Sequence, residues 1–169
     1  MSTEPAIIYL CLGSNLGSRE DNLKKALDLI SHRLRLGKVS SIYDTKPIGD
    51  IPDQPRFLNM VCEIATMLAP PSLMALLQGF ELKLGRLPGK KNAPRPIDID
   101  ILLCGNLVLN TPELTIPHPK MAEREFVLLP LSEIAPDVEH PVLHKTIKEL
   151  LRAVAGEQDV VKYETGKEA

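Results

Sequence analysis

Two aspartates separated by one residue stand in the segment APRPIDIDILL (93–103). Side chains in a strand alternate between its faces, so Asp98 and Asp100 would share one face and the flanking isoleucines the other. Two residues along a strand span roughly 6.5–7 Å, so both carboxylates can converge on one cation or on a close pair. Such hard oxygen ligands suit Mg²⁺, which keeps waters and also binds substrate phosphates. The pattern indicates either a magnesium site or a solvent-facing strand side that carries two acids.

The loop before this strand, residues 86–96, is basic. It carries Arg86, Lys90, Lys91 and Arg95 and no acidic residue. Cations beside a divalent site suggest a polyanion such as a triphosphate, whereas a solvated basic turn is the alternative. The sequence contains neither GxxxxGK[ST] nor GxGxxG, so nucleotide binding would not use a Walker-type phosphate cradle.

Aromatic and polar residues at two other places suit a flat heterocycle. His118 stands between two prolines, which fix its placement, and Arg124 and Phe126 follow shortly after it. Phe57 and Asn59 would share one face of a strand, where the ring can stack on a heterocycle and the amide can bind its edge. A structural histidine, a core phenylalanine and a loop-capping asparagine are the alternatives.

Composition narrows the class of protein. A chain of 169 residues is predicted to be a single domain (1–169), with a frayed tail from about residue 157. A net charge of −2 and the lack of a long apolar run give no indication of nucleic-acid or membrane binding. The start has no basic region typical of a signal peptide, so a cytoplasmic location is predicted. Cys11, Cys62 and Cys104 fit buried reduced thiols.

The elements that must position these residues alternate in type. The order β-α-β-β-α-β predicts an α+β, ferredoxin-like split βαβ fold, with a mainly antiparallel sheet and helices on one face. That fold hosts many activities, so it does not decide the function. The expected strands are 7–12, 39–44, 57–65 and the DID strand, with 107–109 as a hairpin partner of the last; the expected helices are 18–37, 70–85, 121–129 and 146–155.

Four segments together resemble the 6-hydroxymethyl-7,8-dihydropterin pyrophosphokinase family over residues 9–136. They are GSNLG (13–17), TKPIG…FLN (45–59), APRPIDIDILL and PHPKMAEREFVLLPLSEIAP (117–136). The resemblance implies transfer of the terminal diphosphate of ATP to the pterin hydroxymethyl group in folate biosynthesis, with AMP as leaving group. It implies ATP and a reduced pterin as small-molecule substrates, and no obligatory protein partner.

The resemblance also implies roles for individual residues. Asp98 and Asp100 would bind two Mg²⁺ ions and act in catalysis with Arg95. The pterin would be bound by Thr45, Pro47, Ile48, Phe57, Asn59 and Phe126, with the two phenylalanines on either side of the ring. ATP would contact Gln78, Glu81, Arg86, Lys90, Lys91, Arg95, Ile101, Thr115, His118 and Arg124. Many members carry an aromatic residue and a further arginine in the loop where this chain has LPGKKNA (87–93).

The residues suggest how such a transfer would proceed. No side chain stands out as a general base for a primary alcohol, so a metal is expected to orient or acidify it. Arg95, Arg124 and a positively charged His118 would counter the phosphate charge. An ATP·Mg sensor module and another DxD metal-dependent transferase remain alternatives, although neither gives a role to Phe57, Asn59 or Phe126.

Overall fold

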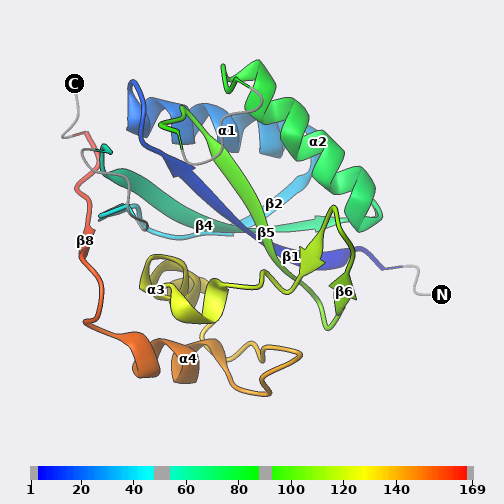
Figure 1. Ribbon diagram of the computed structural model, residues 1–169. Coiled ribbons are helices and arrows are strands. Elements are labelled where there is room, and N and C mark those ends of the chain that lie inside the picture. Colours follow the sequence, from blue (N-terminus) through cyan, green and yellow to red (C-terminus); the bar gives the residue numbers. More distant parts are fainter. Residues whose placement is uncertain (1–3, 48–53, 88–92, 167–169) are drawn as a thin grey trace.

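The computed structural model describes residues 4–47, 54–87 and 93–166 (Figure 1). Three residues of the predicted site, Ile48, Lys90 and Lys91, lie outside the described residues. Parts of the segments 45–55 and 86–96 also lie outside the described residues.

An antiparallel sheet forms the centre of the fold. Its strand order is β5-β1-β4-β3-β8, and β2 also pairs with β4. This is the order expected of a split βαβ unit, and the predicted α+β, ferredoxin-like class is confirmed. The strands are β1 (Ala6–Ser14), β2 (Arg35–Val39), β3 (Tyr43–Thr45), β4 (Phe57–Thr66), β5 (Asp98–Cys104) and β8 (Val160–Lys162).

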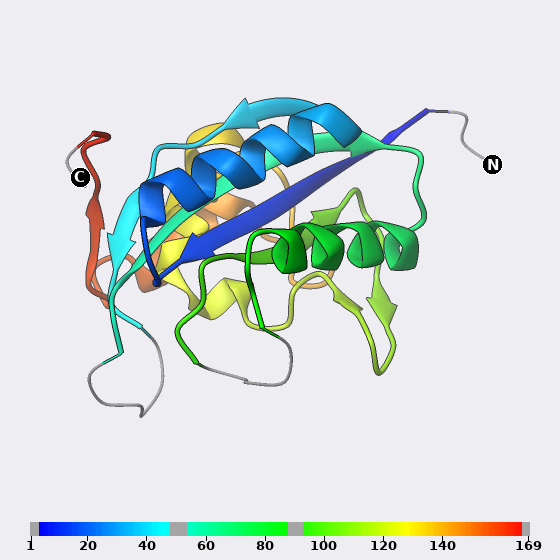
Figure 2. The same ribbon diagram turned by 90° about the horizontal axis from the view of Figure 1, so that it is seen from above.

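Helices cover both faces of the sheet rather than one. The helices α1 (Arg19–Arg33) and α2 (Pro70–Lys83) lie side by side over one face (Figure 2). The helices α3 (Glu125–Ile134) and α4 (Ile147–Val154) lie under the other face (Figure 1). The one-face prediction is wrong because Tyr9, Cys11 and Val61 form a second apolar surface, which the chain after β5 covers.

The strand β5 divides its side chains between these two layers. Ile97, Ile99 and Ile101 are buried in the core beneath α1 and α2. Asp98 and Asp100 alternate with them and point to the side of α3. The alternation predicted for the DID strand is therefore confirmed.

Several predicted boundaries are wrong. The helix α1 ends at Arg33 instead of near Gly37, because Leu34 is already extended and Leu36 pairs with Ile64 on β4. The single strand predicted at 39–44 is replaced by the two strands β2 and β3.

The segment after β5 also differs from the prediction. Residues 107–109 do not pair with β5; instead β6 (Leu109–Asn110) pairs with β7 (Thr115–Ile116). The helix predicted at 121–129 is divided into a 3-10 turn, η1 (Met121–Glu123), and α3, because Arg124 between them is extended.

The C-terminal segment is folded onto the sheet. β8 pairs with β3, and the amide of Gly166 donates to Glu20 Oε1 at 2.7 Å. The predicted frayed tail from about residue 157 is therefore wrong for residues 158–166. The three cysteines are free and buried, as predicted. Among the described helices, none is both long and apolar enough to cross a membrane.

Candidate active site

A pocket of about 780 Å³ opens along the edge of β5 opposite β1. Its walls come from α2, from β5 and from the segment 112–119 that contains β7. It brings together most of the described residues predicted to contact ATP or metal. These are Gln78, Glu81, Arg86, Asp98, Asp100, Ile101, Thr115 and His118.

Asp98 is paired with two arginines. Arg86 Nη1 donates to Asp98 Oδ1 at 2.8 Å, and Arg95 Nη2 lies 3.5 Å from Asp98 Oδ2. Both arginines come from the basic loop segment before β5, so this loop is anchored to the carboxylate at each end of its undescribed part. The guanidinium groups and Asp98 together form a charged surface suited to phosphate.

Asp100 has a different environment. Burial, together with the nearby charges of Asp98 and Glu81, raises the pKa of the Asp100 carboxyl to about 7. A divalent cation bound between Asp98 and Asp100 would relieve this repulsion. In the described part of the chain no three potential metal ligands cluster together. Mg²⁺ bound here would therefore complete its coordination with phosphate oxygens and water, which is its usual preference.

Glu81, predicted to contact ATP, holds the protein together at this point. Its Oε2 accepts a hydrogen bond from the backbone amide of Ile99 at 2.8 Å and another from Arg86 Nη1 at 2.8 Å. Burial raises the pKa of the Glu81 carboxyl. The residue thus fixes both the edge of β5 and the arginine that binds Asp98.

His118 is a neutral group. Burial and the neighbouring Arg124 lower its pKa to about 4. Its Nδ1 accepts a hydrogen bond from the amide of Lys120 at 3.2 Å, so the neutral ring carries its proton on Nε2. The prediction that His118 contributes positive charge is therefore wrong, because the sequence does not reveal the burial and the adjacent cation.

Phe57 and Asn59, two of the residues predicted to bind pterin, lie on the same face of the sheet as the aspartates. Asp98 on β5 pairs with Gly13 on β1, which pairs in turn with Asn59 on β4. Asp98 and Asn59 are therefore two strands apart, roughly 9.5–10 Å. The glycine between them carries no side chain, so the side chains of Asn59 and Phe57 can approach its Cα closely.

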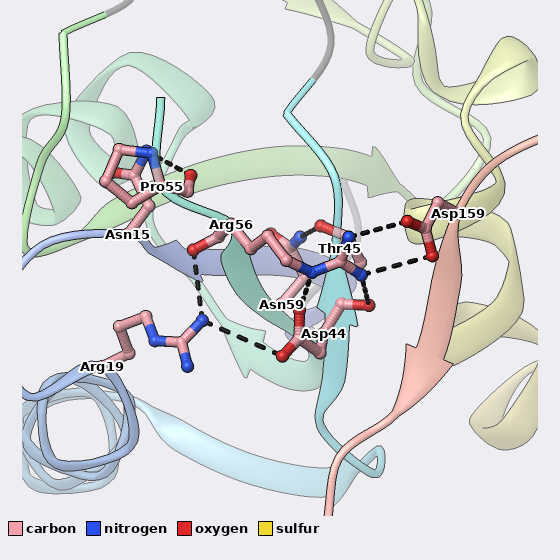
Figure 3. Close-up of polar contacts among 8 residues, drawn as sticks. All are labelled: Asn15, Arg19, Asp44, Thr45, Pro55, Arg56, Asn59 and Asp159. Carbon is pink, nitrogen blue, oxygen red and sulfur yellow. Dashed lines mark hydrogen bonds and ion pairs between the residues drawn. The ribbon is translucent and has the colours of Figure 1, made fainter. Parts of the chain in front are cut away.

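Glycine at position 13 is required by its neighbours. A Cβ atom there would lie 2.6 Å from Asn59 Oδ1 and 3.4 Å from Phe57 Cδ1. Asn59 is almost fully buried and its Nδ2 donates to Thr45 Oγ1 at 2.6 Å (Figure 3). Pro47 lies two residues beyond β3 and is half-buried.

The two phenylalanines each lie beside an arginine. Arg95 stacks over the Phe57 ring at 5.2 Å, and Arg124 stacks over the Phe126 ring at 5.5 Å. Both contacts place a guanidinium group over one face of an aromatic ring, the geometry of a cation–π interaction. Placement of the pterin between Phe57 and Phe126 stays a prediction.

Asn15 is a residue of this region to which sequence reasoning gave no role. Its Oδ1 accepts from the amide of Arg95 at 2.8 Å, and its Nδ2 donates to the carbonyl of Pro55 at 3.3 Å (Figure 3). It is fully buried and so links the ends of both long loops to β1. The GSNLG segment was the available signal, since an asparagine side chain offers both a donor and an acceptor to backbone groups.

A model of the 7,8-dihydro-6-hydroxymethylpterin-pyrophosphokinase (HPPK) family matches residues 9–136. The chain belongs to this family. The 2-amino-4-hydroxy-6-hydroxymethyldihydropteridine pyrophosphokinase of Bacillus subtilis is 47% identical over 135 residues, which are 79% of this chain and 80% of that protein. The protein of the same name from Aquifex aeolicus is 40% identical over 85% of this chain and 89% of its own length.

Longer relatives contain this unit as one part. The folic acid synthesis protein fol1 of Schizosaccharomyces pombe is 40% identical over 89% of this chain, which spans only 21% of that protein. The wild-type HPPK-DHPS crystal structure from Plasmodium falciparum superimposes with a TM-score of 0.75 over 93% of this chain and 46% of that one. Its sequence identity is 17%, so that likeness supports the fold alone.

Proposed function

We propose that this HPPK-family chain transfers the diphosphate of ATP to 6-hydroxymethyl-7,8-dihydropterin in folate biosynthesis, releasing AMP. The observation that carries the proposal is the row Asp98–Gly13–Asn59 across three strands. It adjoins a pocket lined by Arg86, Thr115 and His118 on the aspartate side. A phosphate-binding region and a heterocycle-binding region would thus adjoin each other on one face of the sheet.

Asp98 and Asp100 would hold two Mg²⁺ ions together with the phosphates of ATP. When bound, such a pair shields the phosphate charge and orients the attacking alcohol for in-line displacement at the β-phosphorus. The raised pKa of the Asp100 carboxyl supports this role, because a nearby cation would stabilise its ionised form. The single ion pair from each arginine to Asp98 leaves further guanidinium N–H groups for phosphate oxygens.

The remaining residues would bind and position the substrates. Arg95 lies between Asp98 and the Phe57 ring, so its guanidinium would stabilise charge on the transferred group. His118 would donate an uncharged hydrogen bond from Nε2 to a phosphate oxygen. Asn59 and Thr45 would bind the polar edge of the pterin. In our proposal Gln78, Ile101, Thr115 and Arg124 bind ATP, as do Lys90 and Lys91, while Pro47, Ile48 and the rings of Phe57 and Phe126 line the pterin slot.

The proposed substrates are small molecules, and we propose that a single domain carries the reaction. No protein partner is required in this account, and the cytoplasmic location remains a prediction from composition. An ATP·Mg sensor would not need the pterin-side residues, and neither would an unrelated DxD transferase. The family match favours the pyrophosphokinase over both.

The identity of the nucleotide product tests the proposal. The chain is incubated with Mg·ATP and 6-hydroxymethyl-7,8-dihydropterin, and the nucleotides are separated. AMP should form in equal amount with a pterin diphosphate, and none should form when the pterin is omitted. ADP as the product, or no product at all, would refute the assigned reaction.

A further inference from the structure

The C-terminal segment 156–166 lies beyond the last residue matched by the family model, which is residue 136. It leaves α4, passes the beginning of α3 and then follows the edge of the sheet beside β3 (Figure 1). The segment therefore touches two elements that carry residues of the proposed pterin site.

One tail residue holds the beginning of α3. Gln158 Oε1 accepts from the amide of Glu125 at 2.9 Å, and Gln158 Nε2 donates to the carbonyl of Glu123 at 3.0 Å. In return, Glu125 Oε1 accepts from the amide of Gln158 at 3.1 Å. Glu125 directly precedes Phe126, so these reciprocal bonds fix one aromatic side of the proposed slot.

The next tail residue holds the beginning of β4. Arg56 Nη1 and Nη2 donate to the two carboxylate oxygens of Asp159 at 2.7 and 3.3 Å (Figure 3). Arg56 directly precedes Phe57, the other aromatic residue of the slot. The amide of Lys46 also donates to the carbonyl of Asp159 at 3.1 Å, just beyond Thr45.

The Arg56 contact belongs to a larger network. Arg56 Nε donates to Asp44 Oδ1 at 2.5 Å, and Arg19 Nη1 donates to the carbonyl of Arg56 at 3.2 Å (Figure 3). The hydrogen bond from Arg56 lowers the pKa of the Asp159 carboxyl, so it is ionised at neutral pH. A lone surface ion pair has little effect, but a bidentate pair within a network is the recognised exception.

We propose that Gln158 and Asp159 are positioning residues that set the spacing of the two aromatic sides of the pterin slot. Adjacent residues of one C-terminal segment hold the residues directly before Phe126 and Phe57. Neither tail residue lines the aspartate-side pocket, so their effect should fall on pterin binding and spare ATP binding. The inference rests on the proposed function, because it assigns the slot to a pterin.

The test measures two affinities in the full-length chain. Pterin binding is followed by fluorescence in the presence of Mg²⁺ and a non-hydrolysable ATP analogue, and analogue binding is measured separately. Asp159→Asn keeps the side-chain volume and removes the charge. It should weaken pterin binding about three- to tenfold, the range expected of indirect coupling, while analogue affinity changes less than about twofold.

The matched control is Asp137→Asn. It breaks the 3.0 Å ion pair of Asp137 with Lys148, which also lies beyond the family match but involves neither Arg56 nor Glu125. Both affinities should stay unchanged. In an Arg56→Gln background, Asp159→Asn should have no further effect on pterin binding, because the pair it breaks is already absent.

The outcomes separate this inference from the proposed function. Failure of the unaltered chain to bind pterin would overturn both. Normal pterin binding by Asp159→Asn and by Gln158→Leu would overturn the inference alone. Equal losses of pterin and analogue affinity would also overturn it, since they would indicate general destabilisation of the fold.

Discussion

The two faces of the central sheet are built from the same strands but differ in chemistry. Beneath α1 and α2, the strands contribute an almost purely aliphatic core that includes Leu10, Leu12 and Ile99. On the other face, Asp98, Asp100 and Asn59 lie toward one end of these strands, and an apolar core covers the rest of that face. One strand such as β5 therefore contributes to the core with one set of side chains and, in our proposal, to ligand binding with the other set.

The polar face carries an energetic cost that the aliphatic face does not. Burying a carboxylate near another acid is unfavourable, and the raised pKa of Asp100 reports that cost. Groups that conflict with local stability are expected at sites kept ready for ligands. The fold can tolerate the buried charge because the aliphatic core on the opposite face of the same strands stabilises it.

The largest effect is expected from the aspartates. Asp98→Asn and Asp100→Asn should each lower turnover about 100-fold or more, because each removes a charge that would hold the metal and phosphates. Steady-state kinetics at saturating Mg²⁺ measures this. Near-normal turnover in both variants would remove the basis for assigning the polar face to catalysis.

The two aspartate variants should differ in stability. The raised pKa of Asp100 means that ionisation of its carboxyl destabilises the fold. The protonated carboxyl contributes stability at low pH, and this contribution is lost as the pH rises through about 7. Asp100→Asn should therefore unfold at higher denaturant than the unaltered protein at pH 8, with the gain shrinking toward pH 4. Asp98→Asn should show no such gain, since it leaves Arg86 and Arg95 without their shared partner.

The aliphatic face should respond in the opposite way. Leu10 is fully buried, and Leu10→Ala should lower the free energy of unfolding by about 2–5 kcal/mol. Turnover per folded molecule should remain close to normal, because Leu10 points away from the aspartates. Denaturant unfolding followed by kinetics on the folded fraction distinguishes the two. A large loss of turnover in the folded fraction would contradict the idea that the aliphatic face provides stability and the polar face provides activity.

Gly13 on the polar face and Gly79 on α2 should respond differently to substitution by alanine. Gly13→Ala would displace the buried amide of Asn59, so pterin affinity should fall on the order of tenfold, because small displacements of binding groups are costly. Gly79→Ala in α2 meets no atom within 4 Å and should raise stability by about 0.5–1 kcal/mol, with pterin affinity unchanged. Equal pterin affinities in the two variants would contradict the inference that Gly13 leaves room for the Asn59 amide.

A smaller effect concerns His118. Its pKa of about 4 lies below the usual 6.5, so stability from the neutral ring is present above pH 6.5 and lost as the pH falls through about 4. An NMR titration of the ring should give its midpoint near 4, and His118→Gln should reduce the loss of stability across that range. A midpoint near 6.5 would restore the cationic role expected from the sequence.

The sequence predicted what depends on short-range pattern. The alternation around Asp98 and Asp100 places each side chain on its face, and the Pro70 and Gly85 signals bracket α2 correctly. The order of elements was sufficient for the fold class, because split βαβ units have one common sheet arrangement.

The sequence missed what depends on contacts between distant segments. Asn15 acquires its role from Arg95 and Pro55, which lie 80 and 40 residues away. β8 is short, and only its pairing with β3 defines it as a strand. The charge of His118 depends on burial and on Arg124, neither of which the local pattern reveals.

We expect the paired carboxylates of β5, Asp98 and Asp100, to bind divalent cations together with a triphosphate. Mn²⁺ can replace Mg²⁺ as a paramagnetic probe, and its free concentration is measured by EPR in the presence of a non-hydrolysable ATP analogue. The unaltered chain should bind two Mn²⁺ ions in addition to those that the analogue binds in buffer alone. If the analogue already binds Mn²⁺, the chain should bind the Mn²⁺–analogue complex far more tightly than the analogue alone binds Mn²⁺. Asp98→Asn/Asp100→Asn should lose this binding while remaining folded. Mn²⁺ binding by the double variant equal to that of the unaltered chain would contradict the account.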